Sequence, residues 1–257
     1  MTPPPAPARH RPEPDGPAAR WHRLAADGLV HLDGFHALKH ALRFGADVPL
    51  AVTSDRGGVL ALAGELAPDL GARLEPLLTA VEPAVLAGLV PRPHPTAVAA
   101  LAVPPASTVP ETGRTAPLVV LDNPRHLGNT GAVIRLAAGT GAAGVLTTGT
   151  VDPWHPSVVR AAAGLHYALP VARRQVDELP DGPLYALDPE GADIRDLRIE
   201  DDALLAFGSE RHGLGPELRA RADRLVSLPM RPQVSSYNLA TSVSMTLYHW
   251  LAQRPGS

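Results

Sequence analysis

Asn129 and Arg135 are the first residues of the sequence whose types and spacing suggest chemistry. The apolar run Leu118–Leu121 indicates a buried strand, a loop with Pro and Gly follows it, and Asn129 then stands where a helix N-cap is expected. Arg135 interrupts the apolar stretch of that helix, and an arginine near the carboxyl-end crevice of an open sheet commonly meets an anion. A capped helix with a surface arginine would give the same local pattern.

A glycine-rich turn after the apolar run Leu204–Phe207 is the second candidate. Gly208 would let the backbone approach a ligand without obstruction by a Cβ atom, and Glu210 stands at the mouth of the turn. Taken alone, a tight loop with a solvated carboxylate fits this segment equally well.

A third group of polar residues precedes the last apolar helix, which we expect to begin at Leu239. Leu228 and Met230 lead into a loop, and Ser236 or Asn238 is expected to cap the helix. Polar groups at a helix start can hold a carboxylate or orient a hydroxyl group, although an ordinary helix cap has the same pattern.

A literal G-x-G-x-x-G string at Gly139, Gly141 and Gly144 suggests a dinucleotide site but stands in the wrong context. That fingerprint needs a strand before it and a helix after it. Here a helix precedes the glycines and an apolar strand follows. We therefore interpret them as a helix stop and a tight turn, which argues against a nicotinamide oxidoreductase.

The elements that position these groups alternate between short apolar strands and helices. Such alternation predicts an α/β domain with a parallel sheet covered on both faces. The expected strands are Leu118–Leu121, Val145–Thr147, Leu184–Leu187, Leu204–Phe207 and Leu225–Leu228, and the expected helices are Thr130–Ala138, Ser157–Ala163, Pro216–Ala222 and one from Leu239.

The region before this domain divides into three parts. Residues 1–20 are rich in Pro and Ala and are expected to form a disordered tail, residues 21–104 a small domain, and residues 105–116 a linker to the domain of residues 117–257. In the small domain we expect a strand over Val48–Thr53, helical or loop material over Ala61–Leu78, and an amphipathic helix over Gly34–Arg43. That helix would bury Phe35, Leu38 and Leu42 and expose His36, Lys39, His40 and Arg43.

Composition sets limits on the function. The sequence has no cysteine, which excludes disulfides, thiolate catalysis and cysteine-ligated metal sites. Its formal net charge of −3 offers no general attraction for nucleic acid, so any RNA binding must depend on local patches. It shows neither an apolar run long enough to span a membrane nor an export signal, so we expect a cytoplasmic protein without a membrane partner.

The three segments together resemble the signature motifs of the SpoU branch of the SPOUT methyltransferases, also called the TrmH-like family. The family motifs are Asn-x-Gly-x-x-x-Arg, then Gly-Ser-Glu followed by Gly-Leu, then Ile-Pro-Met followed by Ser-x-Asn and a helix. They are matched, within residues 114–252, by Asn129, Gly131 and Arg135; by Gly208, Ser209 and Glu210 with Gly213 and Leu214; and by Leu228, Pro229 and Met230 with Ser236 and Asn238. Leu228 replaces Ile, and Tyr237 replaces the usual Leu in one wall of the cofactor pocket.

The resemblance implies a SPOUT α/β fold with a C-terminal trefoil knot, preceded by a small α/β substrate-binding domain, and a homodimer formed through the C-terminal domain. It implies S-adenosylmethionine as the cofactor and no metal. Arg135 would lie beside a ribose 2′-hydroxyl of rRNA or tRNA, either as the family's proposed base or as an electrostatic stabiliser. Asn129, Glu210, Ser236 and Asn238 would position the reacting groups, and the cofactor contacts would come from Thr147, Gly208, Leu228, Met230, Ser236 and Tyr237.

RNA contacts are expected from the basic stripe of the helix over Gly34–Arg43, through Lys39, Arg43, His36 and His40, unless that stripe only faces solvent. Arg125 and Arg211, with His126 and His212, flank the predicted pocket as a further RNA-binding surface. Two alternatives stay within the same fold. One is a catalytically silent RNA-binding module, which the complete motif set argues against, and the other is methyl transfer to a base nitrogen.

Overall fold

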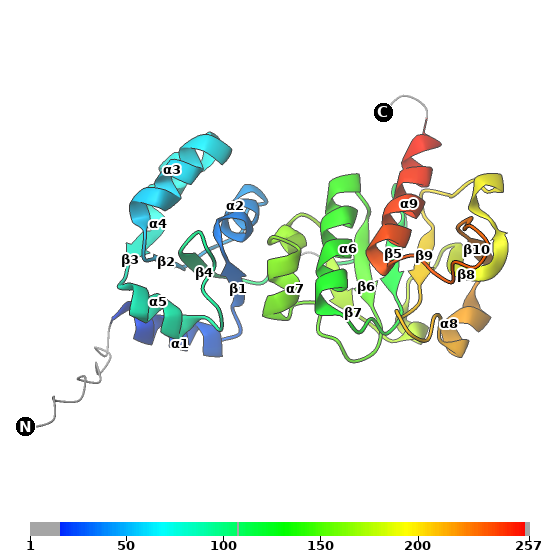
Figure 1. Cartoon of the computed structure of the whole chain (residues 1–257), viewed down its shortest axis with the longest axis horizontal. Helices are drawn as coiled ribbons and strands as arrows, with labels where there is room; N and C mark the ends of the chain where they lie inside the picture. Colours follow the sequence, from blue (N-terminus) through cyan, green and yellow to red (C-terminus); the bar gives the residue numbers. More distant parts are fainter. Residues whose placement is uncertain (1–15, 107, 255–257) are drawn as a thin grey trace, which may run out of the picture.

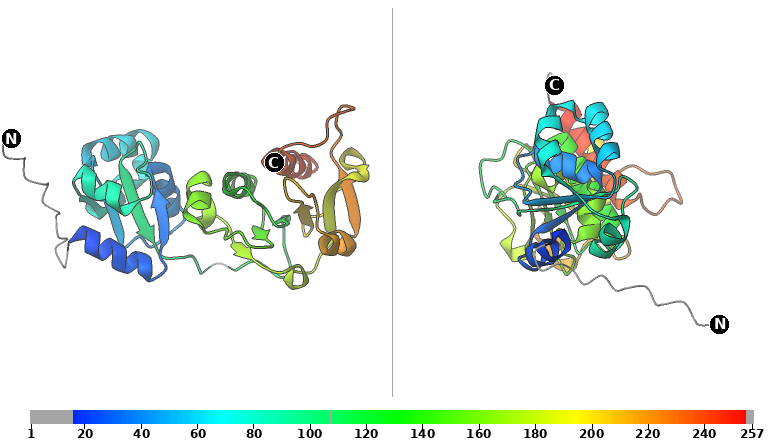
Figure 2. Two further views of the ribbon diagram at one scale, coloured as in Figure 1. Left: turned by 60° about the horizontal axis from the view of Figure 1, so that its bottom comes forward. Right: turned by 90° about the vertical axis from the view of Figure 1, so that its left-hand side faces the viewer.

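The computed structural model describes residues 16–106 and 108–254, which form two units, each built on its own β-sheet (Figure 1). The N-terminal sheet has four strands in the order β1-β4-β2-β3, and the C-terminal sheet has six in the order β10-β8-β9-β5-β6-β7. The two units lie end to end along the long axis, with helix α7 (Pro156–Ala161) between the two sheets (Figure 2). The predicted α/β class is confirmed.

The N-terminal unit is a mixed sheet covered on both faces. Leu38 of α2, Val59 of α3 and Leu74 of α4 share one apolar core, whereas Trp21 of α1 and Leu86 of α5 belong to the core on the opposite face. The elements are α1 (Pro17–Ala26), β1 (Val30–Asp33), α2 (Phe35–Arg43), β2 (Leu50–Thr53), α3 (Arg56–Leu66), the 3₁₀ turn η1 (Pro68–Leu70), α4 (Gly71–Leu77), β3 (Leu78–Ala80), α5 (Pro83–Leu89) and β4 (Val98–Ala102).

Several features of this unit differ from the sequence-based expectation. The expected tail of residues 1–20 reaches into α1, which begins at Pro17, while residues 1–15 lie outside the described part of the chain. Strands β1, β3 and β4 were not anticipated, and the stretch Ala61–Leu78 contains the end of α3, η1 and α4. Pro17 at the first helical position needs no backbone N–H partner, so it can begin the helix that packs Trp21 into the core.

The C-terminal sheet is entirely parallel, and β5 lies at its centre between β9 and β6. Every strand and helix expected here is present, with ends shifted by a few residues, and β7 and a longer β8 are additional. The elements are β5 (Leu118–Leu121), α6 (Leu127–Thr140), β6 (Gly144–Thr147), α7, the 3₁₀ turn η2 (Leu165–Tyr167), β7 (Val171–Arg173), η3 (Val176–Glu178), β8 (Leu184–Asp193), η4 (Ile194–Asp196), β9 (Leu204–Phe207), α8 (Pro216–Arg221), β10 (Arg224–Ser227) and α9 (Leu239–Ala252).

Alternate residues of the central strands point into two separate cores. Val119 and Leu121 of β5 pack with α6, α7 and α9, whereas Leu118 and Val120 pack with α8 on the other face. This explains the continuous apolar strands of the sequence, because a parallel sheet covered on both faces buries both sets of side chains. No helix of the described residues is long and apolar enough to cross a membrane.

The glycine string ends a helix, as predicted. Gly141 adopts a left-handed conformation with φ 72° directly after α6, and β6 begins at Gly144.

The linker is anchored to the C-terminal unit. The guanidinium group of Arg114 is buried and donates hydrogen bonds to the carbonyl oxygens of Pro110, Glu111, Asp181 and Asp202.

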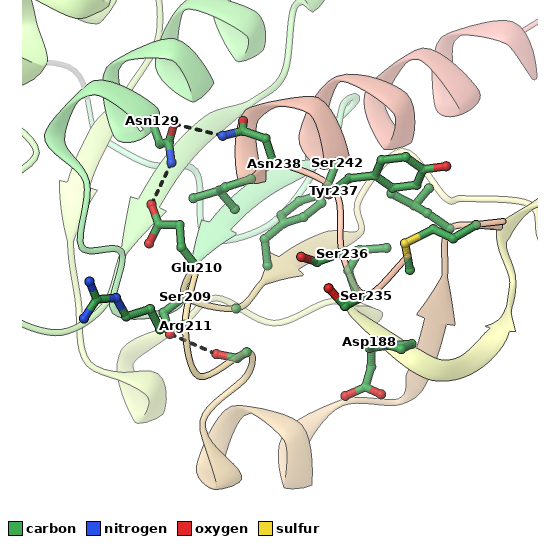
Figure 3. Close-up of a pocket in the computed structure, with 18 of the residues that line it drawn as sticks. Asn129, Asp188, Ser209, Glu210, Arg211, Ser235, Ser236, Tyr237, Asn238 and Ser242 are labelled. Atoms are coloured by element: carbon green, nitrogen blue, oxygen red, sulfur yellow. Dashed lines mark hydrogen bonds between the residues drawn. The ribbon is translucent and has the colours of Figure 1, made fainter. Parts of the chain in front are cut away.

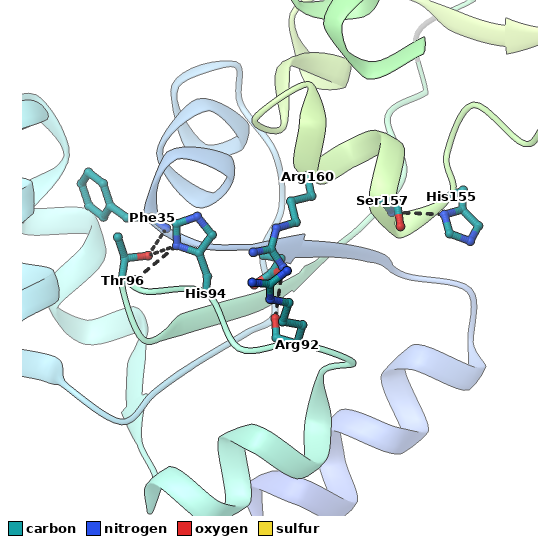
Figure 4. A network of polar contacts seen from close by, with 8 residues as sticks. Phe35, Arg92, His94, Thr96, His155, Ser157 and Arg160 are labelled. Carbon is teal, nitrogen blue, oxygen red and sulfur yellow. Dashed lines mark hydrogen bonds and ion pairs between the residues drawn. The ribbon is translucent and has the colours of Figure 1, made fainter. Parts of the chain in front are cut away.

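A seam of polar and close contacts holds the two units together. Arg160 of α7 pairs with Asp33 at the end of β1 at 2.6 Å and donates to the carbonyl oxygen of Arg92 (Figure 4). His40 of α2 donates through Nδ1 to the carbonyl oxygen of Ala163 at 2.8 Å. The stripe of α2 that we expected to be exposed for RNA contacts therefore turns partly toward the C-terminal unit, and Lys39 is only 9% exposed.

Candidate active site

Three loops of the C-terminal unit begin at the same level of the sheet. Leu121 of β5 is in register with Thr147 of β6 and Phe207 of β9, so the chain leaves all three strands side by side. The buried carboxylate of Asp122 joins these loops, because it accepts hydrogen bonds from the Thr148 hydroxyl at 2.7 Å and from the Gly215 N–H at 2.6 Å. Sequence analysis missed Asp122, since an aspartate after a strand is also typical of an ordinary turn.

The glycine-rich turn after β9 folds back tightly on itself. Ser209 and Gly213 exchange two backbone hydrogen bonds, of 2.8 and 3.1 Å, and Gly213 has φ 66°. A Cβ atom at Gly208 would lie 2.1 Å from the carbonyl carbon of Gly213. A glycine is thus required at position 208 because the chain folds back against it. From the sequence we had expected the reason to be the close approach of a ligand. The turn carries Glu210, whose side chain is partly buried.

One polar side chain from each of the three motifs meets above the sheet (Figure 3). The amide of Asn129 donates through Nδ2 to Glu210 Oε1 at 2.9 Å, and its Oδ1 accepts from Asn238 Nδ2 at 3.3 Å. The other carboxylate oxygen of Glu210 accepts the backbone N–H of Arg125 at 3.2 Å. Residues separated by 81 and 109 positions in the chain thus form one hydrogen-bonded group.

The helices that carry these groups explain their orientation. Helix α6 has His126 at its N-cap, so Asn129 lies in the first helical turn and its side chain is free to reach Glu210, contrary to the expected cap position. Asn238 is the N-cap of α9, and its Oδ1 accepts from Ala240 N–H at 2.9 Å. Capping fixes the Asn238 amide so that Nδ2 points to Asn129.

Glu210 is held in its ionised form. Partial burial raises the pKa of this carboxyl group, but the hydrogen bonds from Asn129 and from the backbone N–H of Arg125 outweigh that effect, and the nearby His126 adds to them. The net result is a pKa below the usual value for glutamate. The group presents a fixed negative charge beside two neutral amides.

A cavity of about 700 Å³ opens beside this group. Its size is that of a typical small-molecule or cofactor site, and its wall mixes apolar side chains with serine and tyrosine hydroxyls. Asn129 and Glu210 form part of the rim. The lining includes Leu187, Asp188, Phe207, Gly208, Ser209, Arg211, Val226, Leu228, Met230, Ser235, Ser236, Tyr237, Asn238, Leu239 and Ser242.

The loop between β10 and α9 forms one wall of the cavity and projects from the body of the unit (Figure 2). The Tyr237 hydroxyl donates to the carbonyl oxygen of Pro229 at 2.9 Å, which ties the two ends of this loop together. Residues 231–238 are otherwise exposed. Tyr237 therefore shapes the wall through a contact that a leucine at this position cannot make.

The structure brings together most, but not all, of the predicted site residues. Glu210, Asn129, Asn238, Ser236, Gly208, Leu228, Met230, Tyr237 and Arg211 line the cavity, whereas Thr147, Arg125 and Arg135 are not among its lining residues. Thr147 is buried at the end of β6, and Arg125 contributes its backbone N–H to Glu210. Arg135 is exposed on α6. Ser235, Ser242 and Asp188 line the cavity without having been singled out.

In the part of the chain that the structure describes, no group of three or more His, Asp or Glu side chains is arranged to hold a metal ion.

Comparison with known families agrees with this arrangement. Residues 116–248 match the model of the SpoU rRNA Methylase family, which is more than half of the chain. The chain belongs to the SpoU rRNA methylase family. The match contains all three motif segments and the six strands of the C-terminal sheet.

Sequence relatives of this SpoU-family chain match about half of it. It is 33% identical over 154 residues to an uncharacterized tRNA/rRNA methyltransferase of Synechocystis, covering 54% of this chain and 56% of the relative. It is 32% identical over 150 residues to the 23S rRNA (uridine(2479)-2'-O)-methyltransferase of Streptomyces viridochromogenes, covering 53% and 52%. The chain thus spans about half the length of these curated relatives.

Solved structures of the same fold extend over both units. The SpoU methyltransferase AviRb of Streptomyces viridochromogenes superposes with a TM-score of 0.74 at 25% identity, over 92% of this chain and 96% of that chain. An RNA 2'-O ribose methyltransferase superposes with a TM-score of 0.71 at 28% identity, over 92% and 93%. The SPOUT fold class is confirmed. The trefoil knot, which concerns the threading of the C-terminal segment, stays a prediction.

Proposed function

We propose that this protein is an S-adenosylmethionine-dependent RNA methyltransferase that methylates a ribose 2′-hydroxyl of structured RNA. The observation that carries the proposal is the convergence of Asn129, Glu210 and Asn238 at the rim of the cavity, in a chain of the SpoU rRNA methylase family. Two relatives named 23S rRNA 2'-O-methyltransferases favour ribosomal RNA over tRNA as the substrate. We infer a cytoplasmic location from that substrate.

The cavity suits the proposed cofactor. A structure of AviRb that contains the cofactor AdoMet has the same fold, with a TM-score of 0.72. In this chain Leu228, Met230 and Phe207 offer apolar surface for a purine, while Ser236 and Tyr237 offer polar groups for a ribose or an amino acid moiety. S-adenosylmethionine would supply an already activated methyl group, so the protein needs no metal for this transfer.

The residues of the chain would then align and stabilise the reacting hydroxyl. The Asn129, Glu210 and Asn238 group is preorganised by its own hydrogen bonds, so it can orient a 2′-hydroxyl without rearranging, and Ser236 contributes a further hydroxyl on the same rim. Arg135 lies farther along α6 and would act once RNA is docked. Guanidinium groups lose a proton only at strongly basic pH, so stabilisation of charge on the 2′-oxygen is the role that its chemistry favours.

We further propose that the protein is a homodimer formed through the C-terminal unit. Tyr248 on α9 is 72% exposed, and such a large aromatic side chain on a mostly apolar helix is typical of a surface that a second copy covers. Sedimentation at micromolar concentration should show a dimer, and an active monomer would contradict the proposal.

The function is tested by incubating the protein with deproteinised ribosomal RNA and S-adenosylmethionine carrying a labelled methyl group, with and without a chelator. We expect chelator-resistant label on a ribose, detected as a nucleotide whose 3′ phosphodiester bond resists alkali because its 2′-oxygen is blocked. The Arg195→Ala variant, at an exposed position outside the cavity, should retain full activity as a control. Label on a base would instead identify a base methyltransferase. Cofactor binding without transfer to any RNA would favour the silent binding module.

A further inference from the structure

Two cations lie close enough at the seam for their charges to interact, and neither has a carboxylate partner. Among the described residues, neither Lys39 of α2 nor Arg135 of α6 makes a hydrogen bond or an ion pair. The nearest carboxylate on this side, Asp69, is already engaged by both Arg43 Nε and Nη2, at 2.9 and 2.5 Å. We call Lys39, Arg135, His36 and His40 the basic face.

Close packing holds the two halves of the basic face in a fixed relation. A Cβ atom at Gly164, just before η2, would lie 2.5 Å from the carbonyl oxygen of Ala37 in α2. A Cβ atom at Gly131 of α6 would lie 2.5 Å from that of Ala161 in α7. Glycines therefore let α2 touch the α7–η2 segment and let that segment touch α6. Arg135 follows Gly131 by one helical turn, on the same side of α6.

The charges of the basic face repel each other in the free protein. Burial lowers the pKa of Lys39, and the positive charges of Arg43 and Arg135 lower it further, with Asp69 opposing them. Burial and the charges of Lys39, Arg135 and His94 likewise lower the pKa of His36. Burial also lowers the pKa of His40. Its bond to the Ala163 carbonyl oxygen opposes this effect, and the charges of Lys39 and Arg135 add to it. An anion placed between these side chains would relieve that repulsion.

We propose that Lys39 and Arg135 together bind a single phosphodiester group of the RNA substrate, so that the RNA bridges the two units. This inference rests on the proposed function. A lysine of α2 and an arginine of α6, two helices that both contact the α7–η2 segment, suit a phosphate, to which arginine can donate two parallel hydrogen bonds. Neither side chain is among the residues that line the cavity. Helix α6 connects the two sites, because Arg135 lies about 9 Å along the axis from Asn129.

The inference changes the predicted partner of Lys39. Sequence analysis paired Lys39 with Arg43 on one helical stripe, but the carboxylate of Asp69 neutralises Arg43. The second cation of the site comes from the other unit and lies 96 residues later in the chain. Local helical spacing gives no signal for such a pair.

The experiment measures the affinity for deproteinised ribosomal RNA over a range of salt concentrations, for Lys39→Met, Arg135→Ala and the double variant. Lys39→Met keeps the buried aliphatic stem and removes only the charge. Each single change should weaken binding about tenfold at physiological salt and reduce the log–log salt slope by less than one, with a reduction of about one in the double variant, because only one phosphate is contacted. Because both side chains hold the same phosphate, the double variant should lose less than the product of the two single losses. Lys39→Arg should retain the slope, and Arg195→Ala removes one exposed charge elsewhere as a control.

Cofactor affinity and thermal unfolding of each variant are measured in parallel, and both should match the unmodified protein. An unchanged affinity and slope in Lys39→Met would overturn the proposal. Independent, fully multiplied losses would assign the two cations to separate phosphates and would also overturn it. Equal displacement of the RNA by poly-glutamate of the same total charge would point to an acidic protein partner instead. If the variants bind RNA as expected but the unmodified protein transfers no methyl group to it, the proposed function is refuted and the phosphate site is not.

Discussion

The rim of the cavity and the basic face are two polar regions of one protein that differ in how their groups are paired. On the rim, Asn129, Glu210 and Asn238 bond to one another, and Asp122 beneath them accepts two hydrogen bonds from neighbouring loops. On the basic face, Lys39 and Arg135 stand near each other with no acceptor among the described residues.

This difference agrees with what we propose that each region binds. A site that orients a small, specific group benefits from side chains that are already fixed, since no reorganisation is needed at the moment of reaction. A site that captures a phosphate gains most if its charges are left unpaired until the phosphate arrives, because the release of repulsion adds to the attraction. In the proposals made above, the rim would therefore align the reacting group and the basic face would capture the phosphate.

Arg135→Ala is expected to have the largest effect, because Arg135 belongs to the basic face and is also the proposed stabiliser of the reacting oxygen. At saturating RNA, the single-turnover methylation rate should fall roughly a hundredfold or more, while cofactor affinity stays nearly unchanged. Lys39→Met provides the contrast, since its rate should recover once RNA is saturating. Equal losses of cofactor binding and rate in Arg135→Ala would show that Arg135 is structural.

We expect acid to destabilise the α7–η2 segment, which packs against both halves of the basic face, at a higher pH than it affects the rim. His166 in η2 is fully buried, which lowers its pKa to about 4, although its bond to the Pro153 carbonyl oxygen acts in the opposite direction. An unfolded histidine titrates near 6.5, so the unfolded state binds the extra proton first and stability is lost as the pH falls from about 6.5 to about 4. The loss at pH 5 amounts to about 2 kcal/mol.

Urea unfolding at pH 7 and pH 5 measures this effect, with His166→Gln as the test variant, because glutamine can still donate to Pro153 and does not titrate. The difference in unfolding free energy between the two pH values should shrink in that variant by about 2 kcal/mol. Glu210, whose pKa is also lowered, likewise loses its contribution as the pH falls, but only at and below the usual glutamate range, which lies well under that of histidine. An unchanged pH dependence in His166→Gln would assign the acid sensitivity to the other seam histidines.

Tyr237→Phe should have the smallest effect and would define how rigid the cavity wall must be. The change removes the bond to the Pro229 carbonyl oxygen, an exposed contact whose net value is about 1 kcal/mol. Cofactor affinity measured by calorimetry should therefore weaken by about two- to tenfold. Tyr167→Phe removes a similar hydroxyl contact, to Val103 in the seam, and should leave cofactor affinity unchanged. Equal effects of both changes would mean that the Tyr237 contact has no special role at the cavity.

The sequence predicted the C-terminal unit better than the N-terminal unit for a physical reason. Leu118–Leu121 and Leu204–Phe207 are continuous apolar runs of a sheet buried on both faces, and both strands have the expected bounds. Val98–Ala102 is equally buried but consists mainly of alanine, which has little strand preference, and Val30–Asp33 contains two polar residues. Short strands of this kind are recognised only once their partners are known.

The site was predictable as a set of motifs but not as a geometry. The resemblance to a family identified Asn129, Glu210 and Asn238, whereas no local rule places side chains so distant in the chain within one hydrogen-bonded group. The role of Asp122 depends on the register of β5 with β6 and β9, and the proposed pairing of Lys39 with Arg135 depends on how the two units pack. Both are consequences of tertiary structure.

The central position of β5 also has a consequence for how the protein folds. Leu118 pairs with Leu204, so a ladder at the middle of the sheet joins segments separated by more than 80 residues. That pairing must close a long loop of chain before its contacts contribute any free energy, and sheets of this kind fold slowly for that reason. During synthesis, β5 emerges from the ribosome well before β9. Until β9 is available, the edge of β5 that pairs with it has unpaired backbone groups. The interval is the period in which this domain is most exposed to aggregation and most dependent on chaperones.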